Sequence, residues 1–327
     1  MLGAAAGFYR VLRANALSFV GFVLVVLIVV LGAIVAIAPH LLVPYAATQS
    51  TGVYNSPPTL FRWPPSFAHP FGTDGAGLDL YSEVMLALPL DLGIGFAIAG
   101  IALLLGGALG LIAGFYDSPG TLGGVVSVVI LRTTDVFLAF PSLLLGLAIV
   151  AALGAGVWQV ILAVLLTWWP YYVRLVRGEV LAVKHLPYVT AARAAGVRER
   201  RILLRHVLRN VLDPVVVYFT LDIGTVLVTF STISFVIPAA ISYPRTPEWG
   251  SMLSYYNLNY PISQYWWAVA FPSLAIFVTA LAFSLLGDGL RDVLDPRSRR
   301  ALVQSAAPST LPPEGPPGRA AEATGGG

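Results

Sequence analysis

The chain has 327 residues, 57% of them hydrophobic and only 11% charged. Soluble domains carry about 25% charged residues, so this composition excludes a soluble protein and predicts an integral membrane protein. The chain has no cysteine, which excludes disulfides and thiol chemistry, and its net charge of +3 is informative only through the positions of the charges.

Six apolar stretches are long enough to cross a hydrocarbon core of about 30 Å, which takes roughly 20 helical residues. They cover residues 17–38, 92–115, 136–155, 157–173, 214–237 and 266–287. None of them alternates with a period of two, as the strands of a β-barrel would. The first is longer than a signal-peptide core and is interpreted as an uncleaved anchor. The sequence therefore predicts an all-α membrane protein with six transmembrane helices.

The basic residues predict the orientation in the membrane, because positive residues in short loops stay on the cytoplasmic side. With six spans, the loops at 40–90, near 156 and at 238–265 lie on one side and carry only Arg62 and Arg245. All other Lys and Arg residues lie on the opposite side. We therefore expect both termini to be cytoplasmic.

This topology predicts three parts of the chain. Residues 1–16 form a cytoplasmic lead, 17–287 a transmembrane domain, and 288–327 a cytoplasmic tail that is disordered from about residue 301, where Pro, Gly and Ala dominate. Within the second span, Gly106, Gly110 and Gly114 recur at every fourth position. Such a stripe lets helix backbones approach closely, and we expect a contact within the chain rather than a dimer face.

The most charged segment is the predicted inner loop 178–213. The stretch Arg174–Arg209 holds nine of the chain's 19 Lys and Arg residues. An Ala-rich turn before Gly196 predicts a short helix with a flat surface, ended by a glycine cap. After it, apolar residues alternate with arginines as in an amphipathic helix, and Asp213-Pro214 is predicted to start the fifth span. A charged loop between spans suits a soluble partner; the alternative is an arginine-rich anchor on lipid headgroups, which does not explain the Ala-rich turn.

This loop resembles the EAA loop of ABC importer permeases, whose pattern is Glu-Ala-Ala, three residues, Gly, nine residues, then Ile-x-Leu-Pro. The matching positions are Ala191, Ala192, Gly196 and Leu208, together with His206 and Asn210, which fit the dipeptide/oligopeptide/nickel branch. Two positions depart from the pattern, with Thr190 in place of the Glu and Arg209 in place of the Pro.

Three further segments resemble the same branch in the same order. They are HPFGTD at residues 69–74, TPEWG at 246–250 and LLGDGLRDVLDPR at 285–297. One segment departs, because ISFVIPAA at 233–240 stands where the family has LSFLGLG. The resemblance covers essentially the whole chain except the tail.

The resemblance implies the type I ABC importer transmembrane fold and a multi-pass permease subunit in the inner membrane. The implied partners are a second homologous permease subunit, two ABC ATPase subunits that bind ATP and Mg, an extracytoplasmic substrate-binding protein and membrane lipid. The family transports di- and oligopeptides, nickel complexes and, in some lineages, oligosaccharides. The implied ATPase-coupling residues are Thr190, Ala191, Ala192, Gly196, Arg201, Arg205, His206, Leu208 and Asn210.

The residues themselves give no sign of catalysis. The single lysine, Lys184, does not lie in a G-x-x-x-x-G-K-[ST] phosphate-binding loop, and no G-x-S-x-G motif is present. The four histidines are scattered and predict no metal site. We expect the chain not to be an enzyme, and to bind no cofactor, metal or nucleic acid itself.

Asp222 is a carboxylate well inside the fifth predicted span, where a lone charge is costly and polar residues face the bundle interior. It either lines the translocation path or its gate, or makes a structural hydrogen bond to a neighbouring helix, which we favour. Two other functions compete with the importer. An ion-gradient transporter would normally have internal repeats and several such carboxylates, and a membrane scaffold would not need the Ala-rich turn.

Overall fold

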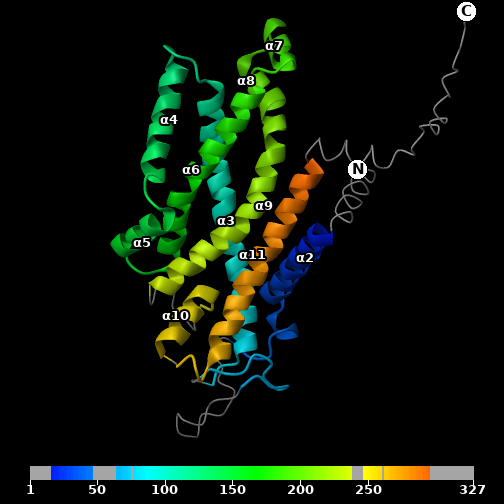
Figure 1. Cartoon of the computed structure of the whole chain (residues 1–327), viewed down its shortest axis with the longest axis vertical. Helices are drawn as coiled ribbons and strands as arrows, with labels where there is room; N and C mark the ends of the chain where they lie inside the picture. Colours follow the sequence, from blue (N-terminus) through cyan, green and yellow to red (C-terminus); the bar gives the residue numbers. More distant parts are fainter. Residues whose placement is uncertain (1–15, 47–63, 75–76, 238–245, 260, 295–327) are drawn as a thin grey trace, which may run out of the picture. The chain divides into compact units, whose positions relative to one another are not determined.

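The computed structural model describes residues 16–46, 64–74, 77–237, 246–259 and 261–294 (Figure 1). These belong to one unit of the chain, Met1–Leu294. The described residues form helices joined by loops, and they contain an isolated antiparallel β-bridge between Thr73 and Asp79. Residues 1–15 of the predicted lead and 295–327 of the predicted tail lie outside the described residues.

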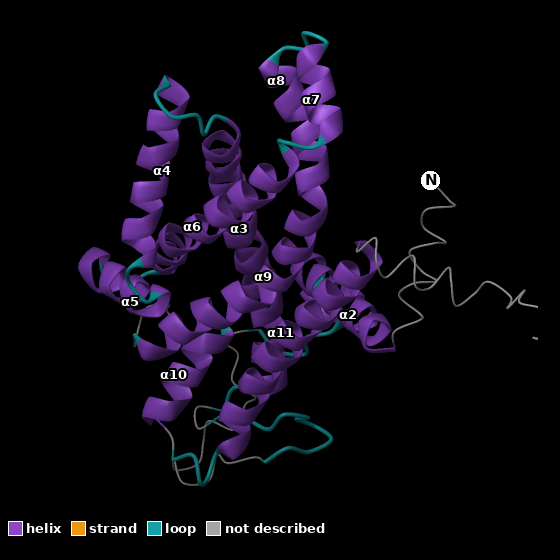
Figure 2. Cartoon of the chain, turned by 45° about the horizontal axis from the view of Figure 1, so that its top comes forward, coloured by secondary structure: helices purple, strands orange, loops and turns teal. Residues whose placement is uncertain are grey.

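Figure 2 shows the helical elements and the loops that join them. The long helices are α2 (Ala16–Ile37), α3 (Leu80–Phe115), α6 (Val157–Val183), α9 (Leu208–Val236) and α11 (Trp266–Leu294). The shorter elements are η1 (Pro39–Leu41), α4 (Leu122–Leu138), α5 (Ser142–Leu153), α7 (Pro187–Ala194), α8 (Glu199–Ile202), the π-helical turn η2 (Leu203–Val207) and α10 (Trp249–Asn259). Among the described residues, five helices are long and apolar enough to cross a membrane, with α8, η2 and α9 counted as one.

The sixth candidate span is broken. α4 and α5 are each too short to cross a membrane and are long and apolar enough only as a pair. Their axes are bent by 86° relative to each other. The predicted span over 136–155 is therefore not one helix, because it covers the end of α4, the bend and α5. The bend lies at Pro141, which is the N-cap residue of α5, because proline donates no backbone hydrogen bond and disfavours a helical conformation in the residue before it.

The second span begins earlier than predicted. α3 starts at Leu80, inside the predicted outer loop 40–90, and its acidic residues Glu83 and Asp91 are buried. The Asp79 carboxylate caps the helix by accepting a hydrogen bond from the backbone N–H of Ser82 at 2.9 Å. The predicted outer loop 238–265 likewise contains a helix, α10.

The glycine stripe of α3 packs against α6. A Cβ on Gly106 would lie 2.3 Å from the carbonyl oxygen of Trp169, and one on Gly114 would lie 2.8 Å from the Cβ of Val180. Gly110 fills the turn between them, again against α6. The predicted contact within the chain is therefore confirmed. The contacts advance in the same order along both helices, which shows that α3 and α6 run parallel.

α11 runs antiparallel to α9. Gly224 of α9 packs on Ala280, whereas the earlier Leu221 packs on the later Gly287. Near the start of α2, Gly21 packs on the final turns of α11. The start of α2 therefore lies against the final turns of α11, and these are the ends of the two helices nearer to α7 and α8 (Figure 1).

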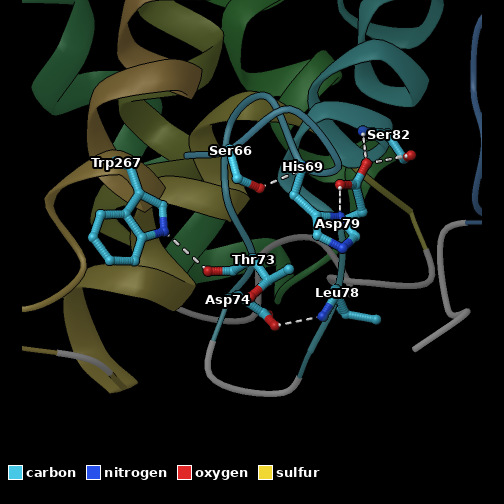
Figure 3. A network of polar contacts seen from close by, with 8 residues as sticks. All are labelled: Ser66, His69, Thr73, Asp74, Leu78, Asp79, Ser82 and Trp267. Carbon is cyan, nitrogen blue, oxygen red and sulfur yellow. Dashed lines mark hydrogen bonds and ion pairs between the residues drawn. The ribbon is translucent and has the colours of Figure 1, made fainter. Parts of the chain in front are cut away.

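At the opposite end, the HPFGTD segment is fixed by polar contacts (Figure 3). His69 Nδ1 lies 2.8 Å from Asp79 Oδ1, and the second oxygen of Asp79 also accepts the Ser82 hydroxyl at 2.6 Å. The indole Nε1 of Trp267 donates to the carbonyl oxygen of Thr73 at 3.0 Å. The segment thus joins the start of α3 to the start of α11.

The TPEWG segment fixes α10 in a similar way. Glu248 accepts hydrogen bonds from the backbone N–H groups of Gly250 and Ser251 at 2.8 and 2.7 Å. The backbone N–H of Trp249 donates to Asp91 at 3.1 Å, and its indole donates to the α3 backbone. A Cβ on Gly250 would lie 2.2 Å from a backbone oxygen of α9. Glu248, Trp249 and Gly250 therefore each make a different contact that positions α10.

Candidate coupling site

The Ala-rich turn forms α7, as predicted. Pro187 occupies its first turn, where a missing backbone N–H is tolerated. Gly196 follows the helix with φ +76°, a conformation that a residue with a Cβ adopts only with strain. The Val197 N–H donates to the Ala192 carbonyl at 3.1 Å and the Gly196 N–H to the Arg193 carbonyl at 3.0 Å. This pair of bonds is a Schellman motif, so the prediction that Gly196 ends the helix is confirmed.

α7 presents a surface of small side chains. Thr190, Ala191 and Gly196 are exposed, and Ala192 is half-buried. On the opposite side of the helix Val189 is fully buried. A neighbouring protein could therefore approach the α7 backbone closely.

α7 and α8 stand on an apolar cluster of their own, which we call the apolar base. Its buried members come from the ends of α3 and α6, from α7 and from the start of the long helix that contains α9. They are Phe115, Val176, Val180, Val183, Val189, Ile202, Leu203, Val207, Val211 and Val215. A larger cluster fills the bundle, and the half-buried Leu103 and Leu175 pack against both.

Polar contacts tie the loop to the bundle. Lys184 Nζ donates to the carbonyl oxygen of Gly114 at 2.9 Å, where a positive charge suits the C-terminal end of α3. Arg177 pairs with Asp117 at 2.8 Å. Desolvation lowers the pKa of Lys184, while the charge of Asp117 acts in the opposite direction. These contacts hold the end of α6 against the end of α3.

A further ion pair lies within the loop. Arg193 Nε lies 2.7 Å from Glu199 Oε1, and this hydrogen bond raises the pKa of Arg193. The pair links the end of α7 to the start of α8 across Gly196. It therefore fixes the angle at which α7 leaves the long helix.

The helix that contains the fifth predicted span starts earlier than Asp213-Pro214, so the prediction that these residues begin it is wrong. Residues Glu199–Val236 form one continuous helical run of 38 residues, with Pro214 inside it. Leu203, Val207, Val211 and Val215 form a buried stripe at every fourth position. Their packing offsets the loss of about 3 kcal/mol that an interior proline causes.

The continuous run contains a feature that the sequence did not reveal. Residues Leu203–Val207 form a π-helical turn, η2, between α8 and α9. Such turns contain one extra residue and have no signature in apolar periodicity. η2 sets the rotation of α8 relative to α9, and Leu203 and Val207 of this turn both reach the apolar base.

The structure brings only some of the predicted site residues together. Gly196, Arg201 and Arg205 line one cleft of about 810 Å³. Its full lining is Ala195, Gly196, Val197, Arg198, Arg200, Arg201, Leu204 and Arg205. We call this the arginine cleft. Its arginines were predicted as the polar face of a helix, but their assembly around a cleft was not.

The remaining predicted residues lie apart from the arginine cleft. Thr190 and Ala191 lie on the exposed side of α7, and His206 and Leu208 are half-buried at the start of the long helix. The amide of Asn210 donates to the His206 carbonyl of the same helix at 2.6 Å.

Asp222 lies between α6 and α9. The Trp168 Nε1 donates to its two carboxylate oxygens at 2.9 and 2.8 Å, and the Tyr172 hydroxyl donates at 2.8 Å. Only 5% of the residue's surface is exposed. The carboxylate therefore takes part in an interhelical contact. Sequence reasoning did not identify Trp168 and Tyr172 as partners of Asp222; their spacing of four residues, which places them on one face of α6, was the available signal.

Comparison with known proteins identifies the family. Residues 106–300 match the family "Binding-protein-dependent transport system inner membrane component". The glutathione transport system permease protein GsiD of Pectobacterium atrosepticum is 40% identical over 233 residues, which are 71% of this chain and 74% of that protein. The probable D,D-dipeptide transport system permease protein DdpC of Escherichia coli K12 is 38% identical over 255 residues, 78% of this chain and 82% of that protein. GsiD of Escherichia coli O6:K15:H31 is 38% identical over 290 residues, 89% of each chain.

A solved structure shows the same fold. A chain of the methionine ABC transporter MetNI, in an inward-facing crystal form, superposes with a TM-score of 0.50 at 17% identity. The match covers 65% of this chain and 95% of that one, which supports the predicted type I ABC importer fold. The chain belongs to the family of binding-protein-dependent transport system inner membrane components and is a multi-pass protein of the inner membrane.

Proposed function

We propose that this chain forms half of the translocation path of an ATP-driven importer for peptides or similar solutes. The family supports a permease subunit rather than an ion-gradient transporter or a scaffold. The relatives above are named for the transport of glutathione and D,D-dipeptides. These names favour peptides over the oligosaccharides and nickel complexes that the resemblance left open.

The proposed assembly contains a second homologous permease subunit, two ABC ATPase subunits and an extracytoplasmic substrate-binding protein. ATP and Mg are bound by the ATPase subunits, so this chain is not itself an enzyme. We place both termini and the loop 178–213 in the cytoplasm. The charge distribution supports this orientation, as do the start of α2 and the end of α11, which are the ends of these helices nearer to α7 and α8 (Figure 1).

One observation carries the coupling role of this loop. α7 is a short helix with an exposed face of small side chains, ended by a left-handed glycine and supported on an apolar base. A helix of this kind can bind in a groove of a soluble subunit and pass a displacement of that subunit on to α6 and α9. We therefore assign Thr190, Ala191, Ala192 and Gly196 to the surface that contacts the ATPase.

The test uses two glycines of the same conformation. Gly196 and Gly120 have φ of +76° and +75°, and a Cβ would meet no atom within 4 Å at either position. Gly196→Val should abolish co-purification of the co-expressed ATPase and ATP-driven uptake of labelled glutathione into proteoliposomes. Gly120→Val, which strains the loop between α3 and α4 equally, should leave ATPase binding intact.

Gly196→Asn provides a second control, because asparagine tolerates a left-handed conformation better than valine does. It should retain most of the ATPase binding. The proposal fails if the wild-type chain binds no ATPase, or if Gly196→Val and Gly120→Val bind it equally. Uptake that depends on an ion gradient and does not require ATP would instead support the gradient-driven transporter.

A further inference from the structure

The arginine cleft has an unbalanced positive charge. Arg198, Arg200, Arg201 and Arg205 line it, and none of them forms an ion pair within the described part of the chain. Glu199 is the one acidic residue between positions 187 and 209, and its carboxylate is paired with Arg193. The cleft is therefore built to receive negative charge from outside this chain.

Its distance from the membrane argues against lipid as the source of that charge. About 20 helical residues cross the hydrocarbon core, so counting back from Val236, the last residue of α9, puts the inner edge of the core near Val217. At about 1.5 Å per residue, Arg205 and Arg201 then lie roughly 18 and 24 Å beyond this edge along the helix. The headgroup layer is only about 5–8 Å thick, and the average helix tilt of about 20° changes the distances little.

The position of the cleft points to the subunit that would contact α7. Gly196 belongs both to the end of α7 and to the lining of the cleft. A protein seated on the exposed face of α7 would therefore cover the edge of the cleft as well. With Thr190 on α7 instead of an acid, the cationic cleft is the main charged feature of this surface.

We propose that the arginine cleft binds an acidic segment of the ATPase subunit, beside the groove that takes α7. This inference rests on the proposed function and adds the chemistry of the partner surface. Guanidinium groups form paired hydrogen bonds with carboxylates, so Asp and Glu side chains are the expected ligands. Exposed charges of this kind act mainly on the association rate and on salt dependence.

The experiment measures binding of the purified cognate ATPase to the full-length permease complex in nanodiscs of uncharged phosphatidylcholine. The double variant Arg201→Gln/Arg205→Gln should weaken binding about tenfold at 50 mM salt and flatten its dependence on salt. Arg209→Gln is the matched control, because Arg209 is exposed on the same helix but does not line the cleft. It should bind like the wild type.

A second double variant, Arg198→Gln/Arg200→Gln, removes the other two charges of the cleft and should weaken binding in the same way. Arginine substitution of one acidic ATPase residue should weaken binding to the wild-type permease but not to the Arg201→Gln/Arg205→Gln variant. Such a non-additive effect of the two substitutions would identify the ATPase segment that occupies the cleft.

Other outcomes separate this inference from the function on which it rests. ATPase binding that is unchanged in both double variants at every salt concentration, yet lost in Gly196→Val, would overturn the cleft proposal and leave the coupling role intact. A loss of ATPase binding by the double variants that occurs only in nanodiscs containing phosphatidylglycerol would overturn the cleft proposal in favour of a lipid site. A wild-type complex that binds no ATPase would overturn both.

Discussion

The Tyr172 hydroxyl donates a hydrogen bond to the Asp222 carboxylate across 2.8 Å, and this contact fastens α6 to α9. The same two helices flank the loop that contains α7 and α8. A displacement of the loop is therefore passed to two helices that are bonded to each other within the bundle. Trp168 strengthens the link from one turn earlier on α6.

Removing the Tyr172 hydroxyl should destabilise the bundle. Tyr172→Phe leaves the buried carboxylate short of one donor, which costs about 1–3 kcal/mol. We expect a lower thermal unfolding midpoint of the purified protein. Tyr218→Phe is the control, because the Tyr218 ring lies 5.4 Å from that of Tyr172 but its hydroxyl has no hydrogen-bond partner in the described residues. Equal midpoints for the two variants would contradict the assignment.

Asp222→Asn tests the two interpretations of this carboxylate. An amide oxygen can accept only part of what the carboxylate accepts, so we expect reduced stability and reduced assembly. Transport per assembled complex, normalised to the ATPase that co-purifies, should be unchanged because the group lies in an interhelical contact. Normal stability combined with lost transport would instead place Asp222 in the translocation path.

Gly106→Ala should separate α3 from α6. The new Cβ would lie 2.3 Å from the Trp169 carbonyl oxygen, and overpacking of this kind typically costs about 1–3 kcal/mol. Gly100→Ala is the matched control in the same helix, since a Cβ there meets no atom within 4 Å. We expect the control to be neutral or slightly stabilising, because alanine favours helix over glycine. Thermal unfolding of both variants measures the difference, and equal loss in the two would refute the contact.

Asp79→Ala should loosen the start of α3. It removes the helix cap on Ser82 and the partner of His69, and loss of the cap alone typically costs about 0.5–2 kcal/mol. Asp79→Asn keeps a capping oxygen and should recover most of the loss. Limited proteolysis of the HPFGTD segment, followed by mass spectrometry, measures the effect locally. Identical cleavage of both variants would show that the cap does not hold this segment.

Local features of the fold were predictable from the sequence, and contacts between distant segments were not. The apolar runs gave the spans because length and hydropathy are properties of each segment alone, and Gly196 gave the end of α7 for the same reason. Hydropathy cannot show that a run changes direction, so the bend at Pro141 falls inside the predicted span 136–155. The burial of Asp91 in α3 could not be predicted, because its hydrogen-bond donor, the Trp249 N–H, lies 158 residues away in the sequence.

The candidate site divides in the same way. Alanines and glycine at fixed spacing identified α7, whereas the arginine cleft depends on the rotation that η2 gives to α8. Trp168 and Asp222 are 54 residues apart in sequence, so their contact follows from helix packing and not from any local pattern.

The π-helical turn η2 provides the sharpest test of how the loop is joined to the membrane helix. Deleting Leu204, an exposed residue within η2, should convert the turn to a regular α-helix. Because the deletion removes the one extra residue of the turn, the residues before it would keep their rotation relative to α9. Ile202 would stay in the apolar base, and α7 would keep its direction.

We therefore expect the Leu204 deletion to retain ATPase co-purification. Deleting Leu212, an exposed residue of α9 outside the turn, is the control, because it rotates everything before it by about 100° and moves it by about 1.5 Å. The Leu212 deletion should abolish ATPase binding while the chain stays inserted in the membrane. Intact ATPase binding by the Leu212 deletion would mean that the loop is fixed by its contacts with α3 and α6, such as that of Lys184 with Gly114, rather than by the register of the long helix.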